Sequence, residues 1–281
     1  MGRTIQIVFM FSLIFGAQRY KILILHSNRI RMKIALVQNE PVQGDPGSSL
    51  ADLDRLIGQG CGADIYVLPE MFATGQYIDP SSVVQTMDGQ IVDWMIQKAS
   101  FLNAAVCGSL PVKENGCTYN RLIFAKPDGT IEFYDKHHLF SYSGEALNFT
   151  PGRDRVVIEF RALRILLLIC YDLRFTVFSR NRDDYDAVFY PANWPEKRIF
   201  AWDTLLRARA IENQCFAIGV NRAGSDDFGY YPGHSAIIGP YGDILVQTDE
   251  QPQMVSADLD MELLTRFRAK FPVLQDDTDT I

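Results

Sequence analysis

Short apolar runs alternate with amphipathic segments along most of the chain, and this alternation limits the folds open to it. In the first half, the pattern predicts strands at 33–38, 64–68 and 104–112, and helices at 50–57 and after residue 88. Residues 45–49 fit a turn and cap before the first helix, and Asp88 fits the cap of the second. Strands and helices of these lengths predict an α/β fold.

The second half of the chain changes to hairpins. The turn signal at 126–129 joins two strand-like runs, and 156–160 pairs with 163–169. The remaining expected elements are a strand at 187–190, a helix at 199–213, a strand at 215–221, a hairpin at 235–247, a strand at 254–258 and a helix at 261–271. Because no linker interrupts this order, one domain of mixed sheets flanked by helices is predicted over 32–272, with an acidic tail at 273–281.

Residues 1–31 stand apart from this pattern. Arg3, an apolar stretch at 5–15 and the small residues Gly16 and Ala17 resemble a weak secretory signal. The stretch is too short and too interrupted for a membrane span. A fresh strand-like start at Met32 favours a second interpretation, in which the extension is an over-extended start site or a loose appendage.

Charge and cysteine content exclude several classes of protein. The formal net charge is −7, and no basic stripe marks a nucleic-acid partner. The five cysteines are odd in number and widely spaced, which indicates a reduced, cytoplasmic protein without a membrane partner. Cys117, His137 and His138 match no common zinc spacing, so no metal site is expected.

Three apolar runs end in side chains that can take part in catalysis. The run IYVLPE ends at Glu70, IEFYDK at Lys136 and LLLIC at Cys170. Ligands usually bind at the carboxyl ends of strands in α/β sheets, so the three side chains can converge in one pocket. A carboxylate can take a thiol proton, and an ammonium favours a thiolate and stabilises an oxyanion. The three together therefore suffice for amide hydrolysis without histidine.

Each of these residues also has a structural interpretation. Cys170 alone fits a core filler, Glu70 fits a solvated turn residue after a proline, and Lys136 fits an ordinary surface charge. Their joint occurrence favours catalysis, but the residues themselves leave both interpretations open.

The motifs LPEMFATG, YDKHHLF and CYDLRF, in this order, resemble those of the nitrilase superfamily of carbon–nitrogen hydrolases. The resemblance covers about 32–271 and implies an α-β-β-α sandwich, commonly paired, so a homodimer or higher homo-oligomer is expected. It implies Cys170 as nucleophile, Glu70 as general base and Lys136 as the third catalytic residue. Glu145 in SYSGEALNF is similar to the second glutamate of many members, which would orient Lys136 or polarise the hydrolytic water.

The stretch at 192–226 looks like the bacterial omega-amidase branch, although Thr176 stands where many relatives have proline. This likeness implies that the small-molecule partner is the terminal amide of a 2-oxo acid such as 2-oxoglutaramate or 2-oxosuccinamate. The amide would be hydrolysed through a thioester without any cofactor. Alternatives are an aliphatic amidase, a nitrilase, an N-carbamoyl hydrolase or a non-catalytic scaffold.

The residues that surround the substrate are harder to predict. The backbone N–H of Tyr171 is a candidate second donor to the oxyanion. Phe140, Tyr142 and Trp194 are candidate walls of the pocket, with packing as the alternative for each. Arg174 is a candidate partner for a substrate carboxylate, and a structural ion pair is its alternative role.

Overall fold

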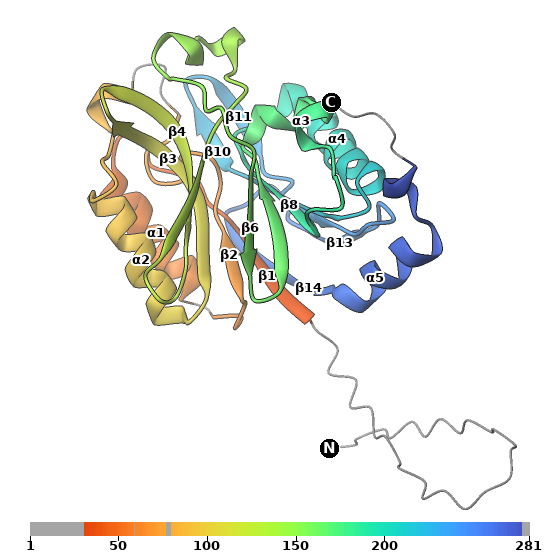
Figure 1. The fold of residues 1–281 in the computed structure, drawn as a ribbon. Coiled ribbons are helices and arrows are strands. Elements are labelled where there is room, and N and C mark those ends of the chain that lie inside the picture. Colours follow the sequence, from red (N-terminus) through yellow and green to blue (C-terminus); the bar gives the residue numbers. More distant parts are fainter. Residues whose placement is uncertain (1–30, 59, 77–79, 277–281) are drawn as a thin grey trace, which may run out of the picture.

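The computed structural model describes residues 31–276, except 59 and 77–79. Two six-stranded sheets form the centre of this part of the chain (Figure 1). The first sheet has the order β14 (Gln253–Asp260), β1 (Arg31–Gln38), β2 (Ile65–Val67), β3 (Ala105–Glu114), β4 (Cys117–Ala125) and β5 (Ile131–Asp135). The second has the order β13 (Ile244–Gln247), β12 (Ala236–Ile238), β9 (Phe216–Asn221), β8 (Ala187–Ala192), β7 (Leu163–Leu167) and β6 (Val156–Phe160).

Helices cover the outer faces of both sheets. They are α1 (Pro46–Ile57), α2 (Gln90–Leu102), α3 (Thr176–Ser179), α4 (Ile199–Glu212) and α5 (Met261–Lys270). In Figure 1, α1 and α2 lie on one side of the paired sheets, and α4 and α5 lie on the other. This arrangement confirms the predicted α/β sandwich, with its layers in the order α-β-β-α.

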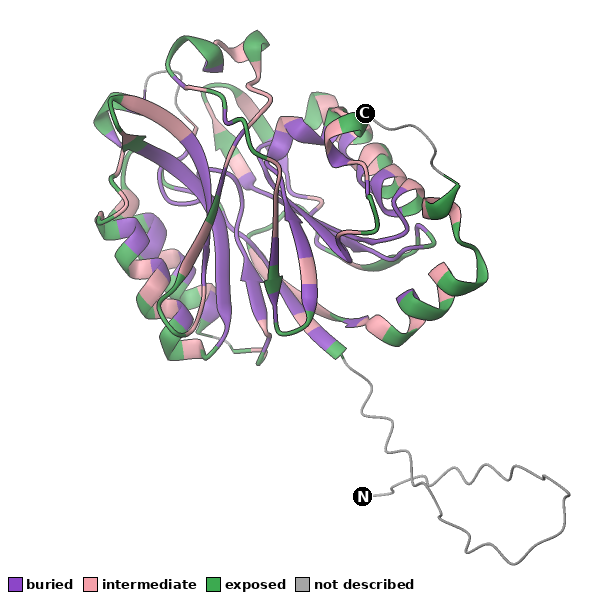
Figure 2. Cartoon of the chain, viewed as in Figure 1, coloured by how far each residue is buried: buried purple, intermediate pink, exposed green. Residues whose placement is uncertain are grey.

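The alternation of side chains along β1 explains why the sheets pack on two faces. Ile34 and Leu36 belong to the core between the sheets, whereas Ala35 and Val37 belong to the core beneath α1 and α2. Figure 2 shows the central strands as almost continuously buried, the edge strands as partly exposed, and the helices as exposed on their outer sides. Both faces of the central strands are therefore apolar, as in the near-continuous apolar runs of the sequence.

The helix starts differ from two expectations. Asp45 is the N-cap of α1, and its Oδ1 accepts a hydrogen bond from the Ser48 amide at 3.1 Å. The helix begins directly at Pro46, so most of the expected turn is helical. The expectation that Asp88 caps the second helix is wrong: Gly89 is the N-cap, without a side-chain bond. A hydrogen bond with Thr86 engages the Asp88 carboxylate instead and lowers its pKa.

A close approach of α4 to the second sheet depends on a glycine. A Cβ built on Gly219 of β9 would lie 2.6 Å from the indole of Trp202 and 2.7 Å from Leu206. Any larger residue would push the helix away from the strand. The helix thus packs directly on β9, next to the end of β8.

One antiparallel ribbon was absent from the sequence expectations. It consists of β10 (Ala223–Asp226) and β11 (Gly229–Pro232). Short 3-10 helices complete the fold: η1 (Pro80–Ser82), η2 (Ser141–Ser143), η3 (Glu145–Leu147), η4 (Cys170–Arg174), η5 (Glu196–Arg198) and η6 (Val273–Gln275). The predictions for residues 1–30 and 277–281 lie outside the described residues. Within the described ranges, no helix is long and apolar enough to cross a membrane.

Candidate active site

The three reactive strand ends come together at one edge of the paired sheets. Glu70 follows β2, Lys136 follows β5, and Cys170 opens η4 just after β7. The Lys136 ammonium donates to Glu70 Oε1 at 2.8 Å and to Glu145 Oε1 and Oε2 at 3.0 and 2.9 Å. The structure therefore brings the predicted base, lysine and second glutamate into direct contact.

Lys136 is almost fully buried between its two carboxylates. Burial lowers the pKa of the amine, but the charges of Glu145 and Glu70 outweigh it, and the net shift is well above the ordinary value. The amine therefore remains a fixed cation. The cluster of one ammonium and two carboxylates has a formal charge of −1. This charge disfavours a negatively charged group of a substrate next to the cluster.

A buried amide that sequence reasoning missed completes this cluster. Asn120 Nδ2 donates to Glu70 Oε1 at 2.8 Å and to Glu145 Oε1 at 3.1 Å. It lies in the middle of β4, and asparagine is uncommon inside strands, which is the one signal that could have indicated it. By holding both carboxylates, Asn120 fixes the direction from which they approach Lys136.

Cys170 occupies a sharp turn between strand and helix. Its φ of 44° is left-handed, a conformation that residues other than glycine rarely adopt. Burial and the negative charge of Glu70 raise the pKa of the thiol well above its ordinary value, against the opposing effects of Lys136 and the Asn193 N–H. This shift favours the protonated thiol in the resting site, next to the carboxylate of the predicted base. The expected thiolate-favouring effect of Lys136 is present but outweighed.

Two backbone amides near the sulfur are candidate donors to an oxyanion. Tyr171 lies in the first turn of η4, where backbone N–H groups lack partners within the helix. This placement is compatible with the predicted role of the Tyr171 amide. Asn193 supplies the other N–H, and both polar atoms of its own buried side chain lack partners within the described part of the chain.

A buried carboxylate ties the cysteine turn to the lysine segment. Asp172 is fully buried, and its oxygens accept from the amides of Ile169 at 3.0 Å and His138 at 2.9 Å. They also lie 2.8 Å from the Tyr134 hydroxyl and 2.8 Å from His138 Nδ1. Tyr134 and His138 flank Lys136 on both sides in the chain, so Asp172 fixes the position of Cys170 relative to Lys136.

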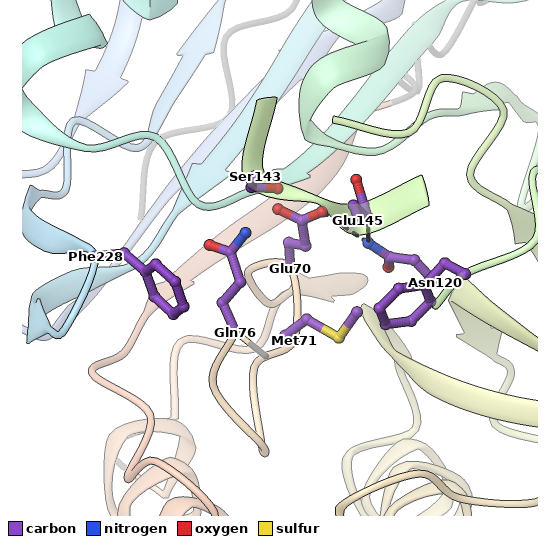
Figure 3. A pocket seen from close by; sticks show the side chains of 8 residues that line it. Glu70, Met71, Gln76, Asn120, Ser143, Glu145 and Phe228 are labelled. Atoms are coloured by element: carbon purple, nitrogen blue, oxygen red, sulfur yellow. Dashed lines mark hydrogen bonds between the residues drawn. The ribbon is translucent and has the colours of Figure 1, made fainter. Parts of the chain in front are cut away.

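A pocket opens beside the glutamates (Figure 3). Its lining consists of Glu70, Met71, Gln76, Asn120, Ser143, Glu145, Phe149 and Phe228. In Figure 3, Glu70 lies between Gln76 and Glu145, and Phe228 lies beyond Gln76. The carboxylate of the expected base therefore faces a cavity with both polar and apolar walls.

The four candidate substrate contacts are more scattered. The Phe140 amide donates to Glu145 Oε2 at 2.6 Å, and its ring lies 4.9 Å from that of Tyr171. Tyr142 is 86% exposed and is not part of the pocket wall.

Trp194 is buried, and the Arg174 guanidinium lies 4.7 Å from its ring. Arg174 lines a different hollow, together with His137, His138 and Phe178.

The described residues contain no group of three histidine, cysteine, aspartate or glutamate side chains arranged to hold a metal ion. His138 instead bonds Asp172 and stacks on Phe175 with ring centroids 3.7 Å apart, and His137 stacks on Phe178 at 4.3 Å. Both histidines thus have structural contacts that support the segment around Lys136.

Comparison with known proteins agrees with this geometry. Omega-amidase YafV of Escherichia coli (strain K12) is 43% identical over 247 residues, which cover 87% of this chain and 96% of that protein. A 2-oxoglutaramate amidase of Bacillus subtilis (strain 168) is 31% identical over 253 residues, covering 88% of this chain and 98% of that protein.

Solved structures show the same fold. XC1258 from Xanthomonas campestris, a CN-hydrolase superfamily protein with an arsenic adduct in its active site, superposes with a TM-score of 0.87 at 38% identity, covering 89% of this chain and 98% of that chain. Nit3 of Saccharomyces cerevisiae gives a TM-score of 0.78 at 25% identity, covering 86% and 94%. A family model for carbon–nitrogen hydrolases matches residues 33–269, and the chain therefore belongs to the carbon–nitrogen hydrolase family, the nitrilase superfamily.

Proposed function

We propose that this protein is an omega-amidase, which releases ammonia from the terminal amide of 2-oxo acids such as 2-oxoglutaramate and 2-oxosuccinamate. The observation that carries the proposal is the buried cluster in which Lys136 bridges Glu70 and Glu145 beside Cys170. The similarity to an omega-amidase and to a 2-oxoglutaramate amidase over most of the chain supports the substrate class.

The first half of the reaction forms a thioester. Glu70 takes the proton of the Cys170 thiol as the sulfur attacks the amide carbon. The new oxyanion is stabilised by Lys136 and the Tyr171 N–H. Glu70 then passes the proton to the nitrogen, the carbon–nitrogen bond breaks, and ammonia leaves. Because the pKa of the resting thiol is raised, proton transfer accompanies the attack instead of preceding it.

The second half hydrolyses the thioester. Glu70, again a carboxylate, takes a proton from water as the water oxygen attacks the carbonyl carbon. The carbon–sulfur bond breaks, and the proton returns to the Cys170 sulfur. Glu145 holds Lys136 in place through two hydrogen bonds and is anchored by the Phe140 amide, so we assign it a positioning role.

The candidate contacts around the substrate fit this scheme in different ways. The Phe140 ring packs on Tyr171 beside the nucleophile, and Tyr142 packs on Phe140 from the solvent side, outside the pocket wall. Trp194 is buried next to Asn193 in the chain and holds the Arg174 guanidinium over its ring, so it has a packing role. In this proposal Arg174 acts through Trp194 and does not bind the substrate carboxylate.

We also propose a cytoplasmic homodimer or higher homo-oligomer. Exposed apolar side chains on α3 and α4, Val177 and Phe200, support an interface between copies of the chain. Light scattering of the purified protein measures the oligomeric state, and a strictly monomeric mass would contradict the proposal.

The activity is tested by ammonia release from 2-oxoglutaramate, glutamine, a simple nitrile and an N-carbamoyl amino acid. The wild type and Cys170→Ala are assayed side by side. We expect release from the 2-oxo amide that disappears in the variant. Release from another substrate alone would replace the omega-amidase assignment with a different carbon–nitrogen hydrolase activity, and release from none would favour a non-catalytic scaffold.

A further inference from the structure

A 2-oxo acid amide carries a carboxylate at the end opposite the amide, and the catalytic cluster cannot bind it. Lys136 already contacts two carboxylates, and the cluster has a formal charge of −1. A second negative charge would be repelled by Glu70 and Glu145 unless a cation stood near the mouth of the pocket.

The buried arginines of the described residues are already paired. Arg121 contacts Asp135 at 2.7 Å, Arg209 contacts Glu212 at 2.8 Å, and Arg222 contacts Asp226 at 2.7 Å. The charge of each of these arginines is already matched by a carboxylate. The cation that binds a substrate carboxylate must come from elsewhere.

Arg198 is a cation beside Phe140, in the segment between Lys136 and Glu145. It has no carboxylate partner in the described part of the chain. It ends η5 and is partly buried, and its guanidinium lies 5.1 Å from the centre of the Phe140 ring. The amide of the same Phe140 bonds Glu145, and the ring contacts Tyr171 next to the nucleophile. A single residue, Phe140, therefore connects Arg198 to Glu145 through its amide and to the cysteine turn through its ring.

The surrounding elements connect Arg198 to the pocket at Glu70, although Arg198 is not one of the residues that line it. Helix η5 packs against β11, and Phe228, which immediately precedes β11, lines the pocket. The segment that leads into η5 also contains Asn193, whose buried side-chain amide lacks hydrogen-bond partners. The segment between β8 and α4 thus presents both an uncompensated cation and unsatisfied polar atoms near Cys170.

We propose that Arg198 binds the carboxylate of the substrate at the end opposite the scissile amide. A guanidinium stacked on an aromatic ring keeps its N–H edges free, and these match a carboxylate in a bidentate pair. Arg198 therefore selects amides with a distal negative charge. This inference rests on the proposed omega-amidase function, because it concerns the same substrate.

The competing cation is Arg174. It is exposed, it lies over Trp194, and it lines the hollow that includes His137 and His138. That hollow shares no lining residue with the pocket at Glu70. Arg198 is favoured because its aromatic partner is bonded directly to the catalytic cluster.

The test is steady-state kinetics on 2-oxoglutaramate with Arg198→Gln, Arg198→Lys and a control, Lys197→Gln, which removes the adjacent exposed charge. Thermal melting confirms that each variant is folded. We expect Arg198→Gln to raise KM by roughly 10- to 100-fold with little change in kcat, since a charge-assisted contact is lost. Arg198→Lys should recover part of the loss, and Lys197→Gln should resemble the wild type.

Three results would overturn the assignment. The first is an unchanged KM in Arg198→Gln, and the second is a fall in kcat as large as the fall in kcat/KM. The third is a selective rise in KM for Arg174→Gln instead. A wild type that releases no ammonia from 2-oxoglutaramate would contradict the proposed function itself, so the two failures are distinguishable.

Discussion

Single residues set the protonation state of the site before substrate arrives. Cys170 is buried beside the negative Glu70, and both effects raise the pKa of its thiol, whereas Lys136 acts in the other direction. Lys136 is engaged by two carboxylates and cannot make the thiolate stable on its own. In the proposed mechanism the thiolate is therefore generated during the attack, with Glu70 as the proton acceptor.

Replacing Glu70 by glutamine should move thiol reactivity and turnover in opposite directions. Loss of the carboxylate charge lowers the pKa of Cys170, so its alkylation by iodoacetamide at pH 8 should become faster. Turnover should fall by roughly 100- to 10,000-fold because the base is gone. Peptide mass spectrometry separates Cys170 from the other four cysteines. An unchanged or slower alkylation would show that Glu70 does not raise the thiol pKa.

At the scale of elements, three strand ends carry the proposed catalytic groups, and one buried carboxylate connects two of these ends. Asp172 in η4 contacts the end of β7 through the Ile169 amide. It contacts β5 through the Tyr134 hydroxyl, and the segment after Lys136 through His138. These bonds hold together two sheet ends that have no direct backbone pairing.

Asp172→Asn should lower kcat more than it changes KM, because it misplaces Cys170 relative to Lys136 without touching the substrate. We expect the free energy of unfolding to fall by about 1–3 kcal/mol, since buried donors lose an acceptor. Tyr134→Phe removes one of the bonds to Asp172 and the bond from the His137 amide to the Tyr134 hydroxyl, and it leaves the Asp172 carboxylate in place as a comparison. Kinetics and urea unfolding measure the two effects. Wild-type kcat in Asp172→Asn would rule out the positioning role.

At the scale of the whole molecule, apolar runs in the sequence predicted most strands and the residues at their ends. Contacts between residues far apart in the chain could not be predicted in this way. The runs that end at Glu70 and Cys170 were visible because β2 and β7 are buried and apolar, and the run before Lys136 was visible from the turn signal that opens its strand. The β10–β11 ribbon was missed because Ala223–Asp226 has no apolar alternation, and backbone pairing alone defines it. Asn120 and Asp172 act through partners far away in the chain, so only the folded structure reveals their contacts.

Buried thiols should lower the free energy of unfolding at alkaline pH. Burial raises the pKa of Cys215 from 9.0 to about 12. Above pH 9 the unfolded chain therefore loses this proton while the folded chain keeps it, and the free energy of unfolding falls as pH rises from about 9 to 12. At pH 10 this thiol should contribute about 1 kcal/mol of the decrease.

Urea unfolding at pH 8, 9 and 10 compares the wild type with Cys215→Ala. The variant should lose less stability between pH 8 and pH 10 than the wild type does, even if it is less stable overall. Parallel pH dependences in the two proteins would show that the buried thiol does not link folding to alkaline pH.

In the proposed mechanism, Cys170 carries the acyl group of the substrate as a thioester. Hydroxylamine added during turnover of 2-oxoglutaramate attacks such a thioester and diverts the product from the acid to the hydroxamate. We predict hydroxamate in proportion to hydroxylamine in the wild type, and neither hydroxamate nor ammonia in Cys170→Ala. Ammonia release that continues in Cys170→Ala would contradict the thioester mechanism. Ammonia release by the wild type without any hydroxamate would contradict it as well.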